Sequence, residues 1–183
     1  MSLSPIRPLL VAGAALLLSA CGPVIIQTQL TSSTEIEGAQ DPLLGQLLGQ
    51  FPGFEQFSNI DFDANQDLKN QGISKDQVDS VKITSVTLTI SAPDDVDFDF
   101  LDQLAFSARA GDLAVPVASK SDISALDLQA PNPTLTLDVT GAELVDVVTA
   151  ESMTIEVTGN GRAPPKNVRL DAVIKVRVEA SVL

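Results

Sequence analysis

Four oxygen-bearing side chains recur at every second position in one acidic stretch of the chain. They are Asp61, Asp63, Asn65 and Asp67. Carboxylate and amide oxygens at alternate positions are ligands with which a protein loop wraps a hard cation such as Ca²⁺. The spacing therefore makes these four residues candidate metal ligands, and a calcium-dependent adhesion module is one function to consider.

Three neighbouring residues depart from a working calcium loop. Gln66 stands where the sharp turn requires Gly, Lys69 occupies a ligand position, and Gly72 replaces the Glu that would bind through both oxygens. In the alternative interpretation, Ile60 and Phe62 face inward and the alternating acids face water, as on an ordinary strand edge or loop. We therefore expect no metal ion and no cofactor in the folded body.

A second acidic cluster follows Ala92-Pro93. Its carboxylates alternate with apolar residues in the order Asp94, Asp95, Val96, Asp97, Phe98, Asp99, Phe100, Leu101 and Asp102. Paired carboxylates can hydrolyse glycosidic bonds without histidine, but the chain has no Trp or Tyr to stack on a sugar. The pattern favours solvated acids in a loop at the end of a sheet, where sandwich folds carry binding surfaces.

The composition excludes several classes of function. The chain has 183 residues with no His and one Cys, which removes Ser–His and Cys–His catalytic sets, His-ligated metals and internal disulfides. Its 24 acidic residues outnumber its 11 basic residues, giving a formal charge of −13. Nucleic acid is therefore not expected as a partner, because phosphate contacts need a basic face. We expect that the protein is not an enzyme.

Residues 1–20 have the form of a secretory signal peptide. Arg7 is the only charged residue, and it precedes the apolar run from Leu9 to Leu18. This run is much shorter than the roughly 20 residues that a membrane-spanning helix needs.

The apolar run ends in Leu18, Ser19, Ala20 and Cys21. This motif resembles the lipobox of bacterial lipoproteins, in which signal peptidase II cuts before the cysteine. The resemblance covers residues 1–21 and implies that Cys21 carries acyl chains such as palmitate. Several acyl chains hold a protein stably on a membrane. Gly22 stands where Asp would favour retention in the inner membrane of enteric bacteria, so the outer membrane is the expected location in the cell envelope.

Most of the secondary structure that the sequence predicts is β-strand. From residue 168 to 182 every even-numbered residue is apolar and nearly every odd-numbered residue is polar, which predicts a long strand with one wet face. Shorter alternating runs surround Leu104, Val115, Leu135 and Ile155. Between Val81 and Ser91 the alternation changes phase, which predicts a β-bulge near Thr84-Ser85.

Turns and short helices separate these runs. Ala110-Gly111-Asp112 predicts a tight turn, and Gly159-Asn160-Gly161 together with Pro164-Pro165 predicts another. Ser74 with Gln77, and Thr140 with Glu143, have the spacing of helix capping boxes. Asp41-Pro42 opens a stripe of Leu and Phe residues up to Phe51, which predicts a short helix.

Together these patterns predict an all-β fold, an antiparallel β-sandwich of the immunoglobulin-like or a related kind, with one or two short helices. A small β-barrel is the alternative. The expected organisation is a signal peptide at 1–20, a lipidated cysteine and tether at 21–40, and one sandwich domain with an N-terminal short helix at 41–183. Within the tether, Val24-Ile25-Ile26 could add a first strand.

The function expected is that of a membrane-anchored bacterial lipoprotein whose body is a non-catalytic envelope-binding or structural module. Its partners would be the membrane, through the lipid anchor, and another envelope protein or polymer. A second hypothesis is a carrier of a lipid or other hydrophobic ligand, because Phe51, Phe54 and Phe57 lie beside a Leu-rich segment. The residues that would bind such a ligand are not indicated by the sequence.

Overall fold

A computed structural model describes residues 23–38, 74–150 and 153–181. The candidate metal ligands Asp61, Asp63, Asn65 and Asp67 lie outside the described residues, as do the lipobox Leu18, Ser19, Ala20 and Cys21. The predicted helix after Asp41-Pro42 also lies outside them. Among the described residues, no helix is long and apolar enough to cross a membrane.

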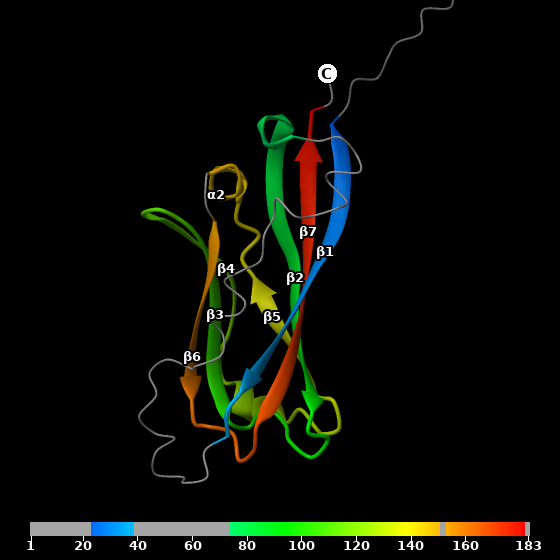
Figure 1. Cartoon of the computed structure of the whole chain (residues 1–183), viewed down its shortest axis with the longest axis vertical. Helices are drawn as coiled ribbons and strands as arrows, with labels where there is room; N and C mark the ends of the chain where they lie inside the picture. Colours follow the sequence, from blue (N-terminus) through cyan, green and yellow to red (C-terminus); the bar gives the residue numbers. More distant parts are fainter. Residues whose placement is uncertain (1–22, 39–73, 151–152, 182–183) are drawn as a thin grey trace, which may run out of the picture.

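The described residues form seven strands in one antiparallel sheet (Figure 1). The strands are β1 (Val24–Ile36), β2 (Val78–Ala92), β3 (Leu101–Ala110), β4 (Leu113–Lys120), β5 (Thr134–Val139), β6 (Thr154–Gly161) and β7 (Val168–Ala180). Three short helical turns accompany them: η3 (Lys75–Gln77), η4 (Ile123–Leu126) and α2 (Val145–Val148). The prediction of an all-β, antiparallel fold with short helices is confirmed.

The sheet curls so that its two halves enclose one core. The strand order is β1-β7-β2-β5-β4-β3-β6. The short strand β5 belongs to both halves, because it pairs with β2 from Thr134 to Leu137 and with β4 at Asp138 and Val139. Figure 1 shows β1, β7 and β2 on one side of β5, and β4, β3 and β6 on the other. Apolar side chains from both halves fill the space between them.

Strand β7 behaves as its sequence predicts. Its even-numbered residues are buried from Val168 to Ala180, whereas Arg169 and Lys175 are exposed on the outer face. β7 pairs with β1 on one side and with β2 on the other. The predicted bulge is also confirmed, since the register of β2 against β7 shifts between Ile83 and Ser85.

The predicted tether is wrong for residues 24–36. This stretch forms edge strand β1, which pairs with β7 from Val24 to Ile36 without a register shift. The pattern was hidden because Thr28 and Thr34 occupy buried positions on the inner face of β1. Polar residues at inward positions remove the apolar alternation by which a half-buried strand is recognised. The folded body therefore begins before residue 41.

Two of the local signals also have different roles from those predicted. Gly159 to Gly161 belong to β6 and pair with β3, so the connection to β7 begins only at Arg162. Thr140 and Glu143 form no capping box, because Glu143 accepts hydrogen bonds from Val81 N–H and Leu144 N–H instead. In contrast, the Gln77 side chain accepts a hydrogen bond from Ser74 N–H, as one half of a capping box requires.

Candidate functional site

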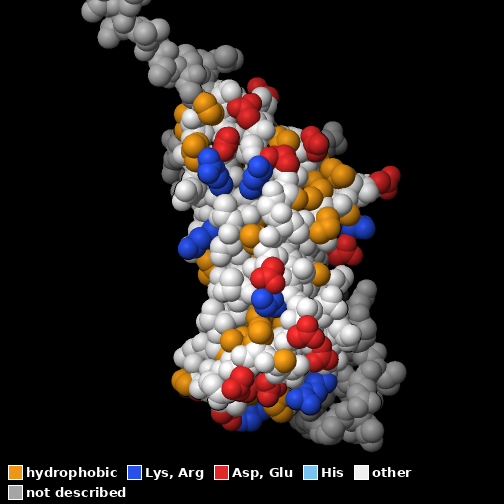
Figure 2. All heavy atoms as spheres, turned by 180° about the vertical axis from the view of Figure 1, so that it is seen from behind, with side chains coloured by type: hydrophobic (Ala, Val, Ile, Leu, Met, Phe, Trp, Pro, Cys, Tyr) orange, Lys and Arg blue, Asp and Glu red, His pale blue; other side chains and the backbone are white. Residues whose placement is uncertain are grey.

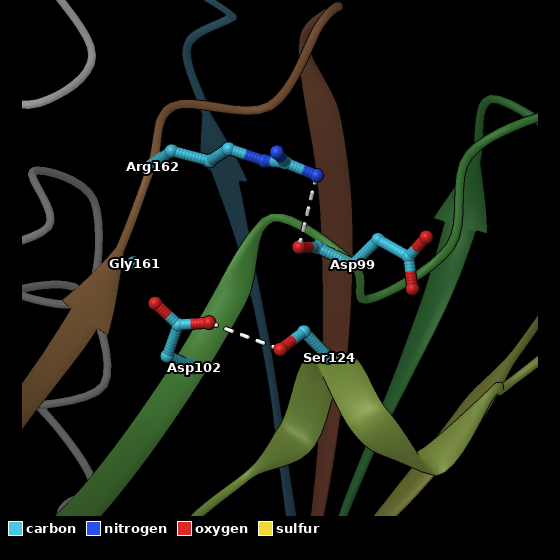
Figure 3. A pocket seen from close by; sticks show the side chains of 5 residues that line it. All are labelled: Asp99, Asp102, Ser124, Gly161 and Arg162. Carbon is cyan, nitrogen blue, oxygen red and sulfur yellow. Dashed lines mark hydrogen bonds between the residues drawn. The ribbon is translucent and has the colours of Figure 1, made fainter.

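The described residues form an open polar hollow on the surface at one end of the body. Its volume is about 430 Å³. It is lined by Asp99, Asp102, Ser124, Gly161 and Arg162 (Figure 3). These residues come from the loop before β3, the start of β3, η4, the end of β6 and the connection to β7. Three separate parts of the chain therefore meet at one site.

The close pairing of β3 with β6 sets the back of the hollow. Gly161 pairs with Leu101, and the register shifts before the next pair, Gln103 with Asn160. The backbones approach so closely that a Cβ on Gly161 would overlap the carbonyl oxygen of Phe100. The same carbonyl accepts a hydrogen bond from Arg162 N–H at 2.8 Å. A glycine is therefore needed at this position for Arg162 to leave the sheet at the hollow.

Asp102 and Ser124 form one wall of the hollow. The Ser124 hydroxyl donates a hydrogen bond to Asp102 Oδ1 at 3.0 Å. Ser124 is held in place by its neighbour Ile123, which is buried in the core and fixes η4 against β3. The second carboxylate oxygen of Asp102 has no hydrogen bond to a described residue, and Asp102 is exposed.

Arg162 forms the opposite wall. One terminal nitrogen of its guanidinium donates a hydrogen bond to the carbonyl oxygen of Asp99 at 3.3 Å. Figure 3 shows the Arg162 side chain lying across the hollow from the carboxylate of Asp102, while the Asp99 carboxylate points away from both. Arg162 forms no ion pair with any residue in the described parts of the chain. The hollow is thus lined by a positively charged guanidinium and a negatively charged carboxylate that form no ion pair with each other.

The loop beside the hollow is built on buried phenylalanines. Phe98 and Phe100 are buried, with ring centroids 6.3 Å apart, and Asp97 Oδ1 accepts a hydrogen bond from Asp99 N–H. Asp99, between the two phenylalanines, is exposed to water, as the alternation predicts. Figure 2 shows this end of the body at the bottom of the view. Acidic side chains gather there, with a few basic side chains among them.

A charge pair joins the loop before β3 to the connection between β6 and β7. The Lys166 ammonium donates a hydrogen bond to Asp95 Oδ2, and this bond lowers the pKa of the Asp95 carboxyl below its ordinary value. Lys166 is thereby partly neutralised, whereas the Arg162 guanidinium still faces the hollow. The hollow is therefore a mixed-charge site within an acidic end of the molecule.

The groups at the hollow are suited to binding. Ser124 lacks a basic partner that would take its proton, because a carboxylate such as Asp102 is a much weaker base than an imidazole. No group of three or more metal-ligating side chains occurs among residues 23–38, 74–150 and 153–181. What remains is a set of hydrogen-bond donors and acceptors with opposite charges.

Sequence reasoning found part of this site. Asp99 and Asp102 belong to the predicted acidic cluster, and that cluster does begin in a loop at the end of the sheet. Ser124 and Arg162 were not predicted to approach it. Gly161 was interpreted as a turn residue, and its pairing with Leu101 brings two of the three segments together.

Comparison with known proteins gives little further information. No family model and no curated protein matches the chain. One similar solved structure is a semi-empty virus-like particle of the Macrobrachium rosenbergii nodavirus, with a TM-score of 0.35 and 10% identity over 100% of this chain and 95% of that chain. Another is Desmodium yellow mottle tymovirus, with a TM-score of 0.26 and 12% identity over 100% of this chain and 93% of that chain.

Proposed function

We propose that this protein is a lipid-anchored component of the bacterial cell envelope whose β body is a non-catalytic binding module. Acyl chains on Cys21 attach it to the membrane, and Gly22 favours the outer membrane. The lipobox-like motif supports the anchor. Strand β1 begins close to Cys21 in sequence, which supports placing one end of the body next to the membrane.

The observation that carries the proposal is the short distance in sequence between the anchor and the sheet. Strand β1 begins at Val24, three positions after Cys21. Val24 pairs with Ala180 at the end of β7, so the anchored end of the body is the end where β1 starts. With so few residues between them, the membrane would lie next to this end.

The polar hollow lies at the other end of the body. Arg162 precedes the start of β7, and β7 has 13 residues. At about 3.3 Å per residue, the two ends of β7 are roughly 40 Å apart. Figure 1 shows the start of β1 at the top and the end of β6 at the bottom. An anchored body that stands upright would present the hollow away from the membrane, where envelope components are accessible.

The hypothesis of a hydrophobic-ligand carrier rests on Phe51, Phe54 and Phe57, which lie outside the described residues. The core of the described body adds no support to it. An apolar gap lies between the two halves of the sheet, beside Leu30, Ile83, Leu144, Ile155 and Ile174. Its volume is about 20 Å³. This is about the space that one water molecule occupies, so the gap cannot hold an acyl chain.

Expression of the full chain in a bacterial host tests the anchor. The mature protein should enter the detergent phase on phase partition, and its intact mass should correspond to cleavage before Cys21 plus acyl groups. Cys21→Ser should leave an uncleaved precursor without acyl groups. Ser19→Ala is the matched control, because it keeps a small residue in the motif and should be processed normally.

The decisive outcome is the mass of Cys21→Ser. If this variant is cleaved and partitions into detergent like the parent chain, the anchor is not at Cys21 and the proposal fails.

A further inference from the structure

We propose that the hollow between Asp102 and Arg162 binds a zwitterionic group of the amino-acid kind, with a free ammonium and a free carboxylate. The inference deepens the proposed function, on which its envelope setting depends. The binding chemistry itself depends only on the described body.

The two walls of the hollow select for both charges in one ligand. Asp102 offers a carboxylate oxygen that is not engaged by Ser124, and Arg162 offers guanidinium donors beyond the one that binds the Asp99 carbonyl. An ammonium group pairs with the first, and a carboxylate pairs with the second through charge-assisted hydrogen bonds. A ligand that carries both groups satisfies both walls.

The surroundings disfavour ligands that carry a single charge. A simple anion at Arg162 would lie near the acids of the 94–102 loop, which repel it. A simple cation at Asp102 would share the hollow with the Arg162 guanidinium. A zwitterion reduces both penalties because it brings the compensating charge with it.

Both walls are held in position before a ligand arrives. Ser124 orients Asp102, and buried Ile123 fixes η4 beneath Ser124. Arg162 is held by its backbone bond to Phe100 and by its side-chain bond to Asp99. Groups that are already oriented lose less conformational entropy on binding, which favours affinity.

In the envelope, such a group occurs on free amino acids and on peptide side chains that keep both an amino group and a carboxyl group free, as in some peptide stems of peptidoglycan. Capture of terminal ammonium and carboxylate groups is a recurring mode of peptide recognition. The chemistry of the hollow is the same for both sources, so the experiment must distinguish them.

The test is an NMR titration of the purified mature protein in detergent micelles. The probes are glycine, the dipeptide alanylalanine, a peptidoglycan disaccharide–tetrapeptide, and ethylamine, acetate and glucose as single-feature controls. Glycine should shift the backbone amide signals of Ser124, Gly161 and Arg162. Ethylamine, acetate and glucose should bind at least about tenfold more weakly, because each lacks one charged contact or both. A peptide-borne source is indicated if the peptidoglycan fragment binds more tightly than glycine.

Two substitutions complete the experiment. Arg162→Gln and Asp102→Asn should each weaken glycine binding about tenfold or more. Arg109→Gln is the matched control, because Arg109 is also exposed but pairs with Glu156 on β3 and β6 away from the hollow. It should leave the affinity unchanged.

The proposal is overturned if glycine leaves these amide signals unshifted, if glucose or acetate binds as well as glycine, or if Arg162→Gln has no greater effect than Arg109→Gln. Spectra of the unliganded variants show whether the fold is kept. The anchor is tested separately by phase partition, so loss of one proposal leaves the other standing.

Discussion

The Glu143 carboxylate accepts a hydrogen bond from the backbone N–H of Val81 at 2.6 Å, although the two residues are 62 positions apart. Glu143 also accepts hydrogen bonds from the Ser80 hydroxyl at 2.7 Å and from Leu144 N–H at 3.1 Å. Val81 O in turn accepts a hydrogen bond from Leu144 N–H at 2.9 Å. These bonds join the segment before α2 to the start of β2.

Removal of the Glu143 carboxylate should therefore destabilise the fold. Glu143→Ala leaves the N–H of buried Val81 without its side-chain acceptor, and the expected loss is about 1–3 kcal/mol in the free energy of unfolding. Glu156→Ala is the control, since Glu156 is exposed and pairs only with Arg109 among the described residues. It should cost less than about 1 kcal/mol. Urea unfolding of both variants gives the comparison, and equal losses would contradict the role of Glu143.

Acid should weaken the fold through the carboxyl groups that are hydrogen-bonded in the folded state. Burial of Glu143 raises its pKa, but the hydrogen bonds from Ser80, Val81 and Leu144 outweigh burial and leave the pKa below the ordinary 4.5. The Ser33 hydroxyl is the largest cause of the lowered pKa of Asp171, with burial acting against it. A group whose pKa is lower in the folded state stabilises the protein above its unfolded pKa and loses this effect as pH falls through the folded pKa.

The free energy of unfolding should accordingly be flat near neutral pH and fall below about pH 4.5. Urea titrations from pH 7 to pH 3 measure this profile. Glu143→Gln removes one of the titrating groups, so its profile should be shallower than that of the parent chain. A parallel profile in the variant would show that Glu143 does not contribute to the acid sensitivity.

The two faces of β7 should respond differently to substitution. Ile174 is 3% exposed, so Ile174→Asp places a charge in the core and should cost several kcal/mol of stability. Lys175 is exposed on the outer face, and Lys175→Ser should change stability by about 0.5 kcal/mol or less. Thermal unfolding of both variants tests the difference, and similar melting temperatures would be incompatible with a one-sided strand.

The contact between β3 and β6 should not tolerate a side chain at Gly161. Gly161→Ala brings a methyl group against the Phe100 carbonyl and within 3.0 Å of Leu101 Cα. Overpacking of this kind costs about 1–3 kcal/mol. Asn160→Ala, at the exposed neighbouring position, should have a much smaller effect. If Gly161→Ala unfolds at the same urea concentration as Asn160→Ala, the close approach of the two strands is not as described.

Features that depend on local periodicity could be predicted from the sequence. The alternation along β7 predicted which face is buried, and the phase change between Ile83 and Ser85 predicted the bulge. Gly111 was correctly placed in the turn between β3 and β4, where its φ of 57° suits glycine. These signals are readable because each arises from neighbouring residues that share one strand or one turn.

The residues that meet from distant parts of the chain could not be predicted in this way. The sequence indicated at most a short strand at Val24–Ile26, because Thr28 and Thr34 occupy inward positions farther along β1. The full length of β1 became visible only through its pairing with β7. Asp102, Ser124 and Arg162 converge because β3 pairs with β6 and η4 lies against β3. Strand order and register are set by packing between segments far apart in the chain, and no periodicity within one segment contains that information.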